Sequence, residues 1–432
     1  MRHFTRAALR GIGVIALSIA CTCVALAQAV PKPLLAPNTP VDWWFAFKFN
    51  AAAAPGCGAA ASRSCIFSGT VKNYNGPHSW SQKFVVASSA NPTLTENPAT
   101  ANNTCLGSTL QDPVGATFNQ IYRGSLFYVI WNDQFYGEPA LFGCGTSCSA
   151  PWGHSKGALA WDRFGNGFVM QVTTPSWPGS AKSAFRRTVQ GNTLGCIGDN
   201  DIEFSQHFFA LALNANDVRL VLEALKNASV VTSPGKAQIV KNGGPQAIKD
   251  AVSALGHKVM DGRATIATLS NGAQLISKPS NLEVPAWQMV SAMLQGVPLR
   301  AATWWTSPAV PTTTTAATPG CWDASLGTPG PVAIATTGTW NGQSIGLKGG
   351  LAPDRNHAKF GVSVPTSPTG PTYTIFGDMN QQGSLAPVAH AHFPNGWCGS
   401  SQNGRGGTWY VLNNPTLFRS VTALLTGESA PP

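Results

Sequence analysis

Short apolar runs, separated by Gly, Pro and polar residues, recur along the chain and predict a β-rich protein. The aromatic segment VDWWFAFKFN (41–50) alternates between apolar and polar positions and predicts an early strand. The continuous apolar run SLFYVIWND (125–133) predicts a buried strand. GALAWD and GFVMQV lie on either side of RFGNG, and this pattern predicts a β-hairpin with a Gly-Asn-Gly turn.

Helical periodicity is confined to a few segments, at 215–229, 245–259 and 285–296. Asn216 or Asp217 is expected to cap the first helix, and Gly256 to end the second. The Pro/Thr/Gly-rich stretch 306–331 predicts an exposed connection tied down at Cys321. Strands mixed with helices on both sides of this connection predict an α/β or mixed α+β architecture.

The first 27 residues predict a secretory signal peptide. Three arginines precede an uncharged run over 11–27, and Ala25-Leu26-Ala27 has the small-residue form of a cleavage site. An uncleaved membrane anchor is the alternative, because the run is nearly long enough to span a bilayer. Cleavage is favoured by the small-residue site, so the mature protein is expected to be secreted or periplasmic, without a membrane attachment.

Charge and cysteine usage fit an exported protein. Charged residues make up 11% of the chain, and loss of the three signal arginines lowers the formal net charge from +10 to +7. The net positive charge suggests an anionic partner such as nucleic acid, although an exported protein that is basic without such a partner fits equally well. Ten cysteines become eight after cleavage, which predicts up to four disulfides of unknown pairing rather than a zinc site.

A His-x-Lys spacing occurs twice, in GHSKGALAWD (153–162) and NHAKFGVSV (356–364). Residues i and i+2 of a strand share one face, about 7 Å apart. His154 with Lys156, and His357 with Lys359, would each place an imidazole beside an ammonium. A phosphodiester needs this pair, because one group attacks phosphorus or carries a proton while the other binds the phosphoryl oxygens.

The two motifs also share a local context, since each opens a strand–turn–strand unit. Either copy alone would more often be a surface pair than a catalytic one. Two copies predict a duplicated module in which one histidine attacks phosphorus and the other protonates the leaving oxygen. A neutral attacker and a cationic acid predict a bell-shaped pH profile on the acid side of neutrality.

The segments around the motifs resemble the deoxyribonuclease II family of the phospholipase D superfamily. VDWWFAFKFN is similar to the family's opening strand, and FYVIWNDQ to the segment ahead of the first motif. IATLSNGAQLISKPSN is similar to the central region, and FGDMNQQG and NGRGG to the C-terminal elements. These segments lie in the family's order along most of the mature chain, and the signal-peptide style favours a bacterial homologue.

The resemblance implies a phospholipase D-like fold of two pseudo-symmetric halves, at 28–235 and 236–432, each with a mixed β-sheet flanked by helices. It implies an acid endonuclease that needs no cofactor or metal and cleaves double-stranded DNA without reading its bases. A phosphohistidine intermediate would leave 3′-phosphate and 5′-hydroxyl ends. The protein is expected to be a monomer with pseudo-twofold symmetry or a homodimer.

The resemblance assigns His154 and His357 as the catalytic pair and Lys156 and Lys359 as phosphate clamps. Sequence does not decide which histidine attacks, although His154 is favoured because the attacker in the superfamily is often in the first motif.

Three further residues receive supporting roles. Asp162 is expected to orient a histidine across the site, Asp378 to do the same for the second half, and Asn380 to donate to a phosphate oxygen. An Asx turn is the alternative for Asp378 and Asn380. The longer gap before GDMN could displace both, and Gln171 stands where many relatives have a histidine.

Two other functions remain open at this point. A phosphodiesterase of the same superfamily could act on phospholipid headgroups, or a catalytically silent DNA-binding envelope protein could keep the fold. His207 is expected in an apolar strand, and His390 with His392 in a loop rather than a metal site.

Overall fold

The computed structural model describes residues 30–49, 84–96, 106–107, 110–122, 124–134, 147–175, 177–178, 204–236, 239–350 and 355–432. Residues 31–432 form one compact unit. The predicted signal peptide at 1–27 lies outside the described residues. Across the ranges described, every helix is too short or too polar to cross a bilayer.

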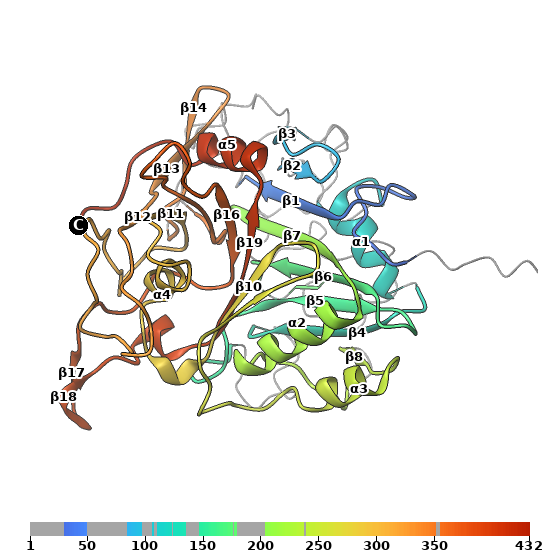
Figure 1. Ribbon diagram of the computed structural model, residues 1–432, viewed down its shortest axis with the longest axis horizontal. Coiled ribbons are helices and arrows are strands. Elements are labelled where there is room, and N and C mark those ends of the chain that lie inside the picture. Colours follow the sequence, from blue (N-terminus) through green and yellow to red (C-terminus); the bar gives the residue numbers. More distant parts are fainter. Residues whose placement is uncertain are drawn as a thin grey trace, which may run out of the picture. The chain divides into compact units, whose positions relative to one another are not determined.

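The first sheet is built from the N-terminal part of the chain, and all its paired strands are antiparallel. Its order is β3-β2-β1-β7-β6-β5-β4-β8 (Figure 1). The strands are β1 (Trp43–Lys48), β2 (Phe84–Ser88), β3 (Thr95–Glu96), β4 (Phe127–Asn132), β5 (Lys156–Trp161), β6 (Gly167–Val172), β7 (Gln206–Leu213) and β8 (Val240–Lys241).

The second sheet comes from the C-terminal part, in the order β12-β11-β15-β16-β19-β10-β9. Only its β11–β12 pair is parallel. The strands are β9 (Thr265–Thr268), β10 (Gln274–Lys278), β11 (Leu299–Ala302), β12 (Val332–Ile334), β15 (Phe360–Ser363), β16 (Tyr373–Gly377) and β19 (Gly407–Asn413). Two small hairpins join β13 (Thr337–Trp340) to β14 (Gln343–Gly346), and β17 (Val388–His390) to β18 (Phe393–Trp397).

Aromatic side chains join the two sheets into one core. Phe45 and Phe209 of the first sheet contact Phe376 of the second, at ring-centroid distances of 4.7 and 4.3 Å. Phe47 lies 5.4 Å from Phe360 in the same layer. Because successive side chains of a strand point to opposite faces, Trp44 lies on the other side of β1 and donates to Thr117 of α1. Burial on both faces explains why β1 is apolar throughout, apart from Lys48.

Helices cover the sheets on their outer sides. The α-helices are α1 (Pro113–Tyr122), α2 (Ala215–Asn227), α3 (Gln246–Ser253), α4 (Ala286–Met293) and α5 (Pro415–Leu424), with short 3-10 helices at Ser280–Leu282 and Ser401–Gly404. The helix α2 packs on β6 and β10 and against α3, and α5 packs on β15 and β16. The coarse prediction of a mixed α and β architecture is therefore confirmed.

The predicted strands and the β5–β6 hairpin are confirmed, but one helix cap is not where the pattern put it. Asn214, rather than Asn216 or Asp217, caps α2 by accepting a hydrogen bond from the Asp217 amide at 2.9 Å. The side chain of Asp217, at the third helical position, in turn accepts a hydrogen bond from the Asn214 amide, and the two bonds form a capping box. The helix α3 ends at Ser253, three residues before Gly256 adopts a φ of 79°.

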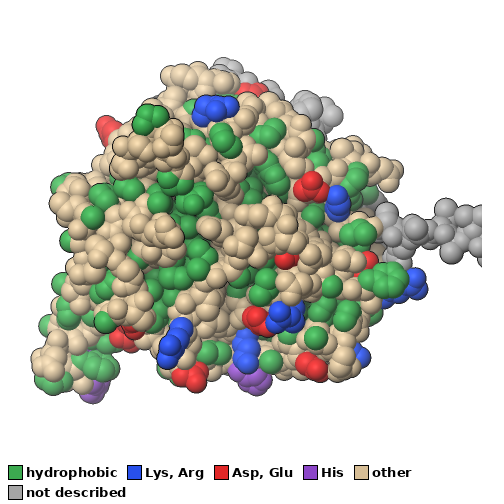
Figure 2. Space-filling model, viewed as in Figure 1, with side chains coloured by type: hydrophobic (Ala, Val, Ile, Leu, Met, Phe, Trp, Pro, Cys, Tyr) green, Lys and Arg blue, Asp and Glu red, His purple; other side chains and the backbone are tan. Residues whose placement is uncertain are grey.

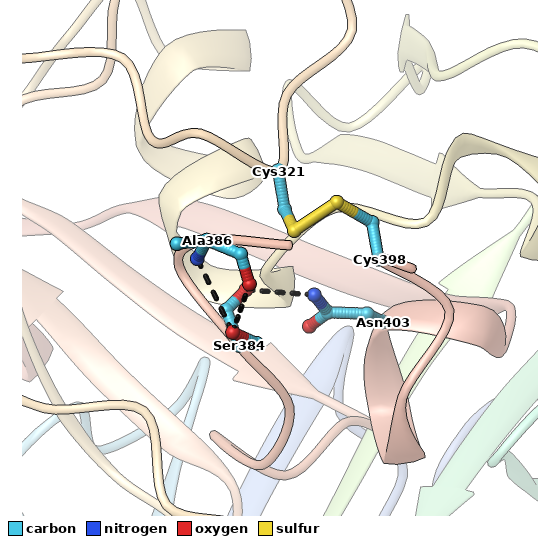
Figure 3. The surroundings of a disulfide bond; sticks show 5 residues. All are labelled: Cys321, Ser384, Ala386, Cys398 and Asn403. Carbon is cyan, nitrogen blue, oxygen red and sulfur yellow. Dashed lines mark hydrogen bonds between the residues drawn. A yellow bond between two sulfur atoms is a disulfide. The ribbon is translucent and has the colours of Figure 1, made fainter. Parts of the chain in front are cut away.

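The connection at 306–331 is anchored as predicted, by a disulfide between Cys321 and Cys398 (Figure 3). Cys148 is disulfide-bonded as well. The first sheet extends past the expected boundary at 235, because β8 adds to its edge beside β4. All strands of the second sheet follow from Thr265 onward.

Candidate active site

The first His-x-Lys motif lies where the chain enters β5. Gly153 precedes it and packs so closely that a Cβ there would come within 2.4 Å of the Ala228 carbonyl. The His154 amide donates to the Gly406 carbonyl at 2.8 Å, which ties the motif to the segment just before β19 of the second sheet. Lys156 begins β5 itself. The motif therefore bridges the two sheets.

The second motif is held by residues in and next to β7 of the first sheet. Ser205, just before β7, forms a parallel bridge with Asn356, and its carbonyl accepts from the His357 amide at 2.8 Å. The Lys359 amide donates to Nδ1 of His207 at 3.0 Å, and the Lys359 carbonyl accepts from Gly377 at 2.8 Å. Each motif thus contacts the sheet that the other motif belongs to.

Both motifs open onto one cavity of about 240 Å³. All four residues assigned to the chemistry line it, so the structure brings together side chains about 200 positions apart in the sequence. The lining residues are Gln134, His154, Lys156, Thr173, Pro175, Trp304, His357, Lys359 and Asn380. A cavity with two imidazoles and two ammonium groups is suited to a phosphate group.

The tautomer of His154 follows from its partner. Its Nδ1 lies 2.8 Å from the backbone carbonyl of Asp378, and a carbonyl oxygen can only accept. Nδ1 therefore carries the proton, and the neutral ring keeps its lone pair on Nε2. Burial, together with the charge of Lys156, lowers the pKa of His154 well below its usual range.

His357 has a different environment. Its Nδ1 lies 3.2 Å from Nε2 of Gln206, whose Oε1 accepts from the Thr173 hydroxyl at 2.7 Å. In this arrangement His357 accepts at Nδ1 and carries its proton on Nε2. The ring stacks on Phe204 at 4.1 Å and contacts Trp304 at 4.7 Å. Burial and the charge of Lys359 lower the pKa of His357.

Lys156 and Lys359 both line the cavity, and their ammonium groups repel each other there. Burial and the neighbouring Lys156 lower the pKa of Lys359 well below its usual range. Burial likewise lowers the pKa of Lys156, although Asp133 opposes the change. An anion in the cavity would favour the charged forms of both lysines and of the histidines.

Sequence reasoning missed Asp133 and Arg405, which hold the first lysine in place. Asp133 pairs with Lys156 at 2.6 Å and with Arg405 at 2.8 Å, and its side chain is fully buried. Burial alone would raise the pKa of Asp133, but Lys156, His154 and Arg405 together lower it. Arg405 also donates to the carbonyls of residues 148, 152 and 153. FYVIWNDQ and NGRGG contain both residues, so the quoted segments carried the signal.

Asp378 joins three strands beneath the cavity. Its carboxylate accepts from Ser155 and Thr408 hydroxyls, both at 2.6 Å, and from Gln171 at 3.0 Å. Burial raises the pKa of Asp378 to about 6, against these hydrogen bonds. Asp378 contacts His154, the histidine across the site, through its backbone carbonyl and not through its carboxylate.

Gln171 and His207 form a second buried layer. Oε1 of Gln171 lies 3.4 Å from Nε2 of His207, while its amide nitrogen reaches Asp378. His207 is a strand residue with no exposed surface, as expected, but it also supports Lys359 through the backbone amide. Periodicity could place His207 in the core and could not reveal this contact.

Asn380 lines the cavity, and Asp162 does not. Nδ2 of Asn380 donates to Gln382 at 2.9 Å, and its buried Oδ1 has no hydrogen-bond partner within the described chain. Asp162 lies at the far end of β5, where its carboxylate accepts from the amides of Phe164 and Asn166 at 2.8 and 3.1 Å. The expectation that Asp162 orients a histidine is therefore corrected: it stabilises the hairpin turn.

Other described histidines, and the tryptophans near the first motif, lie outside the cavity lining. His390 and His392 belong to the β17–β18 hairpin, with ring centroids 5.6 Å apart. Trp131, Trp161 and Trp177, which lie near the first motif in the sequence, are buried core residues and do not line the cavity. On the face seen in Figure 2, described Lys and Arg side chains stand singly, several of them beside Asp or Glu.

Comparisons with known proteins identify the family of this chain. The profile of the family described as Deoxyribonuclease II matches residues 33–386, which include both His-x-Lys motifs. A comparison with curated protein sequences returns no match. The matched region covers most of the chain, so the protein belongs to the deoxyribonuclease II family and is a hydrolase of DNA phosphodiester bonds.

Proposed function

We propose that the protein is an acid endonuclease that cleaves DNA through a phosphohistidine at His154, without a metal. The observation that carries this proposal is the single cavity lined by both imidazoles and both ammonium groups. Lys156 and Lys359 bind the non-bridging oxygens of the scissile phosphate and stabilise the charge that develops there.

In the first step, Nε2 of His154 attacks phosphorus and forms a P–N bond. This assignment is supported by the Asp378 carbonyl, which keeps the proton on Nδ1 and leaves the lone pair on Nε2. The bond from phosphorus to the 5′ oxygen breaks, and that oxygen takes a proton from cationic His357. The strand that keeps the 3′ oxygen stays attached to His154.

The cation at His357 forms when the phosphate enters, because a nearby anion favours the charged imidazole. A proton on Nδ1 then requires Gln206 to present its carbonyl oxygen. The Thr173 hydroxyl lies 3.2 Å from the His207 carbonyl, so it can donate there and accept from the rotated Gln206 amide. Gln206 thus serves both protonation states.

In the second step, water attacks the phosphohistidine and transfers a proton to neutral His357. The P–N bond breaks, His154 recovers its lone pair, and the products are a 3′-phosphate and a 5′-hydroxyl. The unpartnered Oδ1 of Asn380 is suited to accept a hydrogen bond from this water. This replaces the expected donation from Asn380 to a phosphate oxygen.

A phospholipase D-like pseudo-symmetric fold is part of the proposal, and the strand order supports it. In the first sheet, β5-β6-β7 are consecutive neighbours, α2 follows β7, and β1 lies beyond it. In the second sheet, β15-β16-β19 take the same places, α5 follows β19, and β10 lies beyond it. Lys156 begins β5, and Lys359 immediately precedes β15.

We further propose that the substrate is double-stranded DNA bound without regard to sequence, and that the enzyme acts after export and signal cleavage. Contacts made by lysines to phosphate oxygens carry no base information and weaken as salt rises. The protein then works as a pseudo-twofold monomer or as a homodimer.

The test is cleavage of supercoiled plasmid at pH 5 and pH 7.5 with excess EDTA. We expect nicking at pH 5 in the presence of EDTA. We also expect the nicked 3′ ends to carry a phosphate, so that a polymerase extends them only after phosphatase treatment. Rapid acid-free denaturation should trap a DNA strand on the wild-type enzyme and none on His154→Ala. Trapping on His154→Ala, or loss of all cleavage in EDTA, would refute the mechanism. Hydrolysis of phosphatidylcholine in place of DNA would favour the phospholipid alternative.

A further inference from the structure

Lys278 is a fully buried lysine at the end of β10. Its ammonium nitrogen lies 2.8 Å from the Asn403 carbonyl, 2.8 Å from the Arg405 carbonyl and 3.3 Å from the Pro279 carbonyl. Three backbone oxygens therefore converge on one side-chain nitrogen. An ammonium group has three N–H donors, and a neutral amine has two and a lone pair that would face the third oxygen.

The segment that Lys278 holds is the one that positions His154 and Lys156. The carbonyl of Gly406 accepts from the His154 amide, and the guanidinium of Arg405 binds Asp133, the partner of Lys156. Gly406 has no room to move, because a Cβ there would lie 2.3 Å from the Ala228 carbonyl. A displacement of residues 403–406 would reach both the attacking histidine and its lysine.

The rest of this segment is fixed on its other side. The disulfide of Cys398 precedes it, and Nδ2 of Asn403 donates to the Ser384 carbonyl at 2.8 Å (Figure 3). These contacts hold the side chain of Asn403, whereas Lys278 holds the backbone oxygens of residues 403 and 405. The two sets of contacts are therefore not interchangeable.

We propose that Lys278 is a positioning residue for DNA cleavage, and that its ammonium form is required to align His154 through residues 403–406. The inference rests on the proposed function. Lys278 touches neither the cavity nor DNA, so its effect falls on the rate of the chemical step rather than on substrate binding.

The charge on Lys278 depends on pH in the working range of such an enzyme. Burial lowers the pKa of Lys278 to about 7, with the carboxylate of Glu283 acting in the opposite direction. The guanidinium of Arg405 points away, toward Asp133. The three-donor ammonium is complete in acid and is lost as pH rises through about 7. Alignment of His154 should be lost over the same interval.

The first experiment compares Lys278→Met with wild type in plasmid cleavage from pH 4.5 to 8.5. We expect kcat at pH 5 to fall by about 10- to 100-fold with KM for DNA unchanged, because a small misplacement of the attacking group has effects of this size. The exposed Lys241→Met is the matched control and should keep wild-type kinetics. A folded Lys278→Met enzyme with kcat within about twofold of wild type would overturn the proposal.

A second variant tests the role of Lys278 even if Lys278→Met does not fold. Glu283→Gln leaves the three hydrogen bonds of Lys278 in place and removes the carboxylate that supports its charge. We expect the alkaline limb of the kcat profile to move to lower pH by about half a unit. An unchanged limb would overturn the role of Lys278. Absence of DNA cleavage by the wild-type enzyme in acid would instead overturn the proposed function itself.

Discussion

Removal of the Asp133 charge should damage both stability and catalysis. The Asp133 carboxylate has no exposed side-chain surface and pairs with Lys156 at 2.6 Å and Arg405 at 2.8 Å. Asp133→Asn keeps the shape and leaves two cations buried without a counter-charge. Breaking one buried pair in this way costs about 3–5 kcal/mol. We therefore expect the free energy of unfolding to fall by about 4 kcal/mol or more.

The same change should affect the reaction, because Lys156 loses the group that fixes its position and supports its charge. We expect kcat to fall by about 100-fold or more, which corresponds to about 2.7 kcal/mol in the barrier. The assays are urea unfolding and plasmid cleavage, both at pH 5.5. The pKa of Asp133 is lowered on folding, so its stabilising contribution is present above about pH 4 and is lost only below it.

Asp42→Asn is a matched control for Asp133→Asn. Asp42 pairs with Lys32 at 2.7 Å, a similar separation, but the two side chains are 62% and 41% exposed. An exposed pair of this kind contributes about 0.2–1 kcal/mol. If Asp133→Asn unfolds like Asp42→Asn and cleaves DNA at the wild-type rate, the argument from buried charge is wrong.

Three further variants test other parts of the structure. Gly406→Ala should lower kcat by about tenfold or more, because its Cβ would lie 2.3 Å from the Ala228 carbonyl and displace the acceptor of the His154 amide, whereas Gly235→Ala, with open space around it, should match wild type. Folding raises the pKa of Asp378 to about 6, so ionisation of Asp378 lowers stability as pH rises from about 4 to 6. The stability that wild type has over Asp378→Asn in urea unfolding should therefore shrink by up to about 3 kcal/mol over that window. A constant difference would contradict the assignment. Loss of the Cys321–Cys398 disulfide in a double Cys→Ser variant should destabilise the protein by about 4 kcal/mol, since the bond closes a loop of 77 residues; unchanged thermal unfolding would count against it.

The sequence was sufficient for most elements and for the four His-x-Lys residues that line the cavity, because both depend on local pattern. The aromatic and apolar character of residues 41–50 predicted β1, and the Gly-Asn-Gly turn predicted the β5–β6 hairpin. The His-x-Lys spacing selected side chains that the fold brings to one cavity. Even the longer gap before GDMN did not displace Asn380, since β16 pairs with β15 and returns the chain to the cavity.

Sequence reasoning failed where a role depends on strand pairing far along the chain. Asp133 lies just after β4, Arg405 just before β19 and Lys278 at the end of β10. Only the assembled sheets bring Asp133 to the Arg405 guanidinium and Lys278 to the Arg405 carbonyl. Asp162 failed for the opposite reason. It was assigned by resemblance to the acidic residue that follows the first motif in the superfamily, but β5 is six residues long and carries it to the end of the strand away from the cavity.

The division of labour between the two histidines follows from backbone and amide groups that no motif contains. Two copies of one motif would be chemically equivalent in a symmetric site. Here the His154 ring meets a carbonyl oxygen, which can only accept, and the His357 ring meets a glutamine amide, which can donate or accept. One ring is therefore held in the tautomer that the proposed attack requires, and the other can gain and lose a proton. A Gln206→Glu variant would offer His357 only an acceptor and would stabilise its cation, so it should slow the first step, in which His357 gives up its proton, more than the second. Slower turnover with less DNA trapped on the enzyme than in wild type, measured by rapid denaturation, would support this reasoning, and accumulation of the DNA-bound enzyme would contradict it.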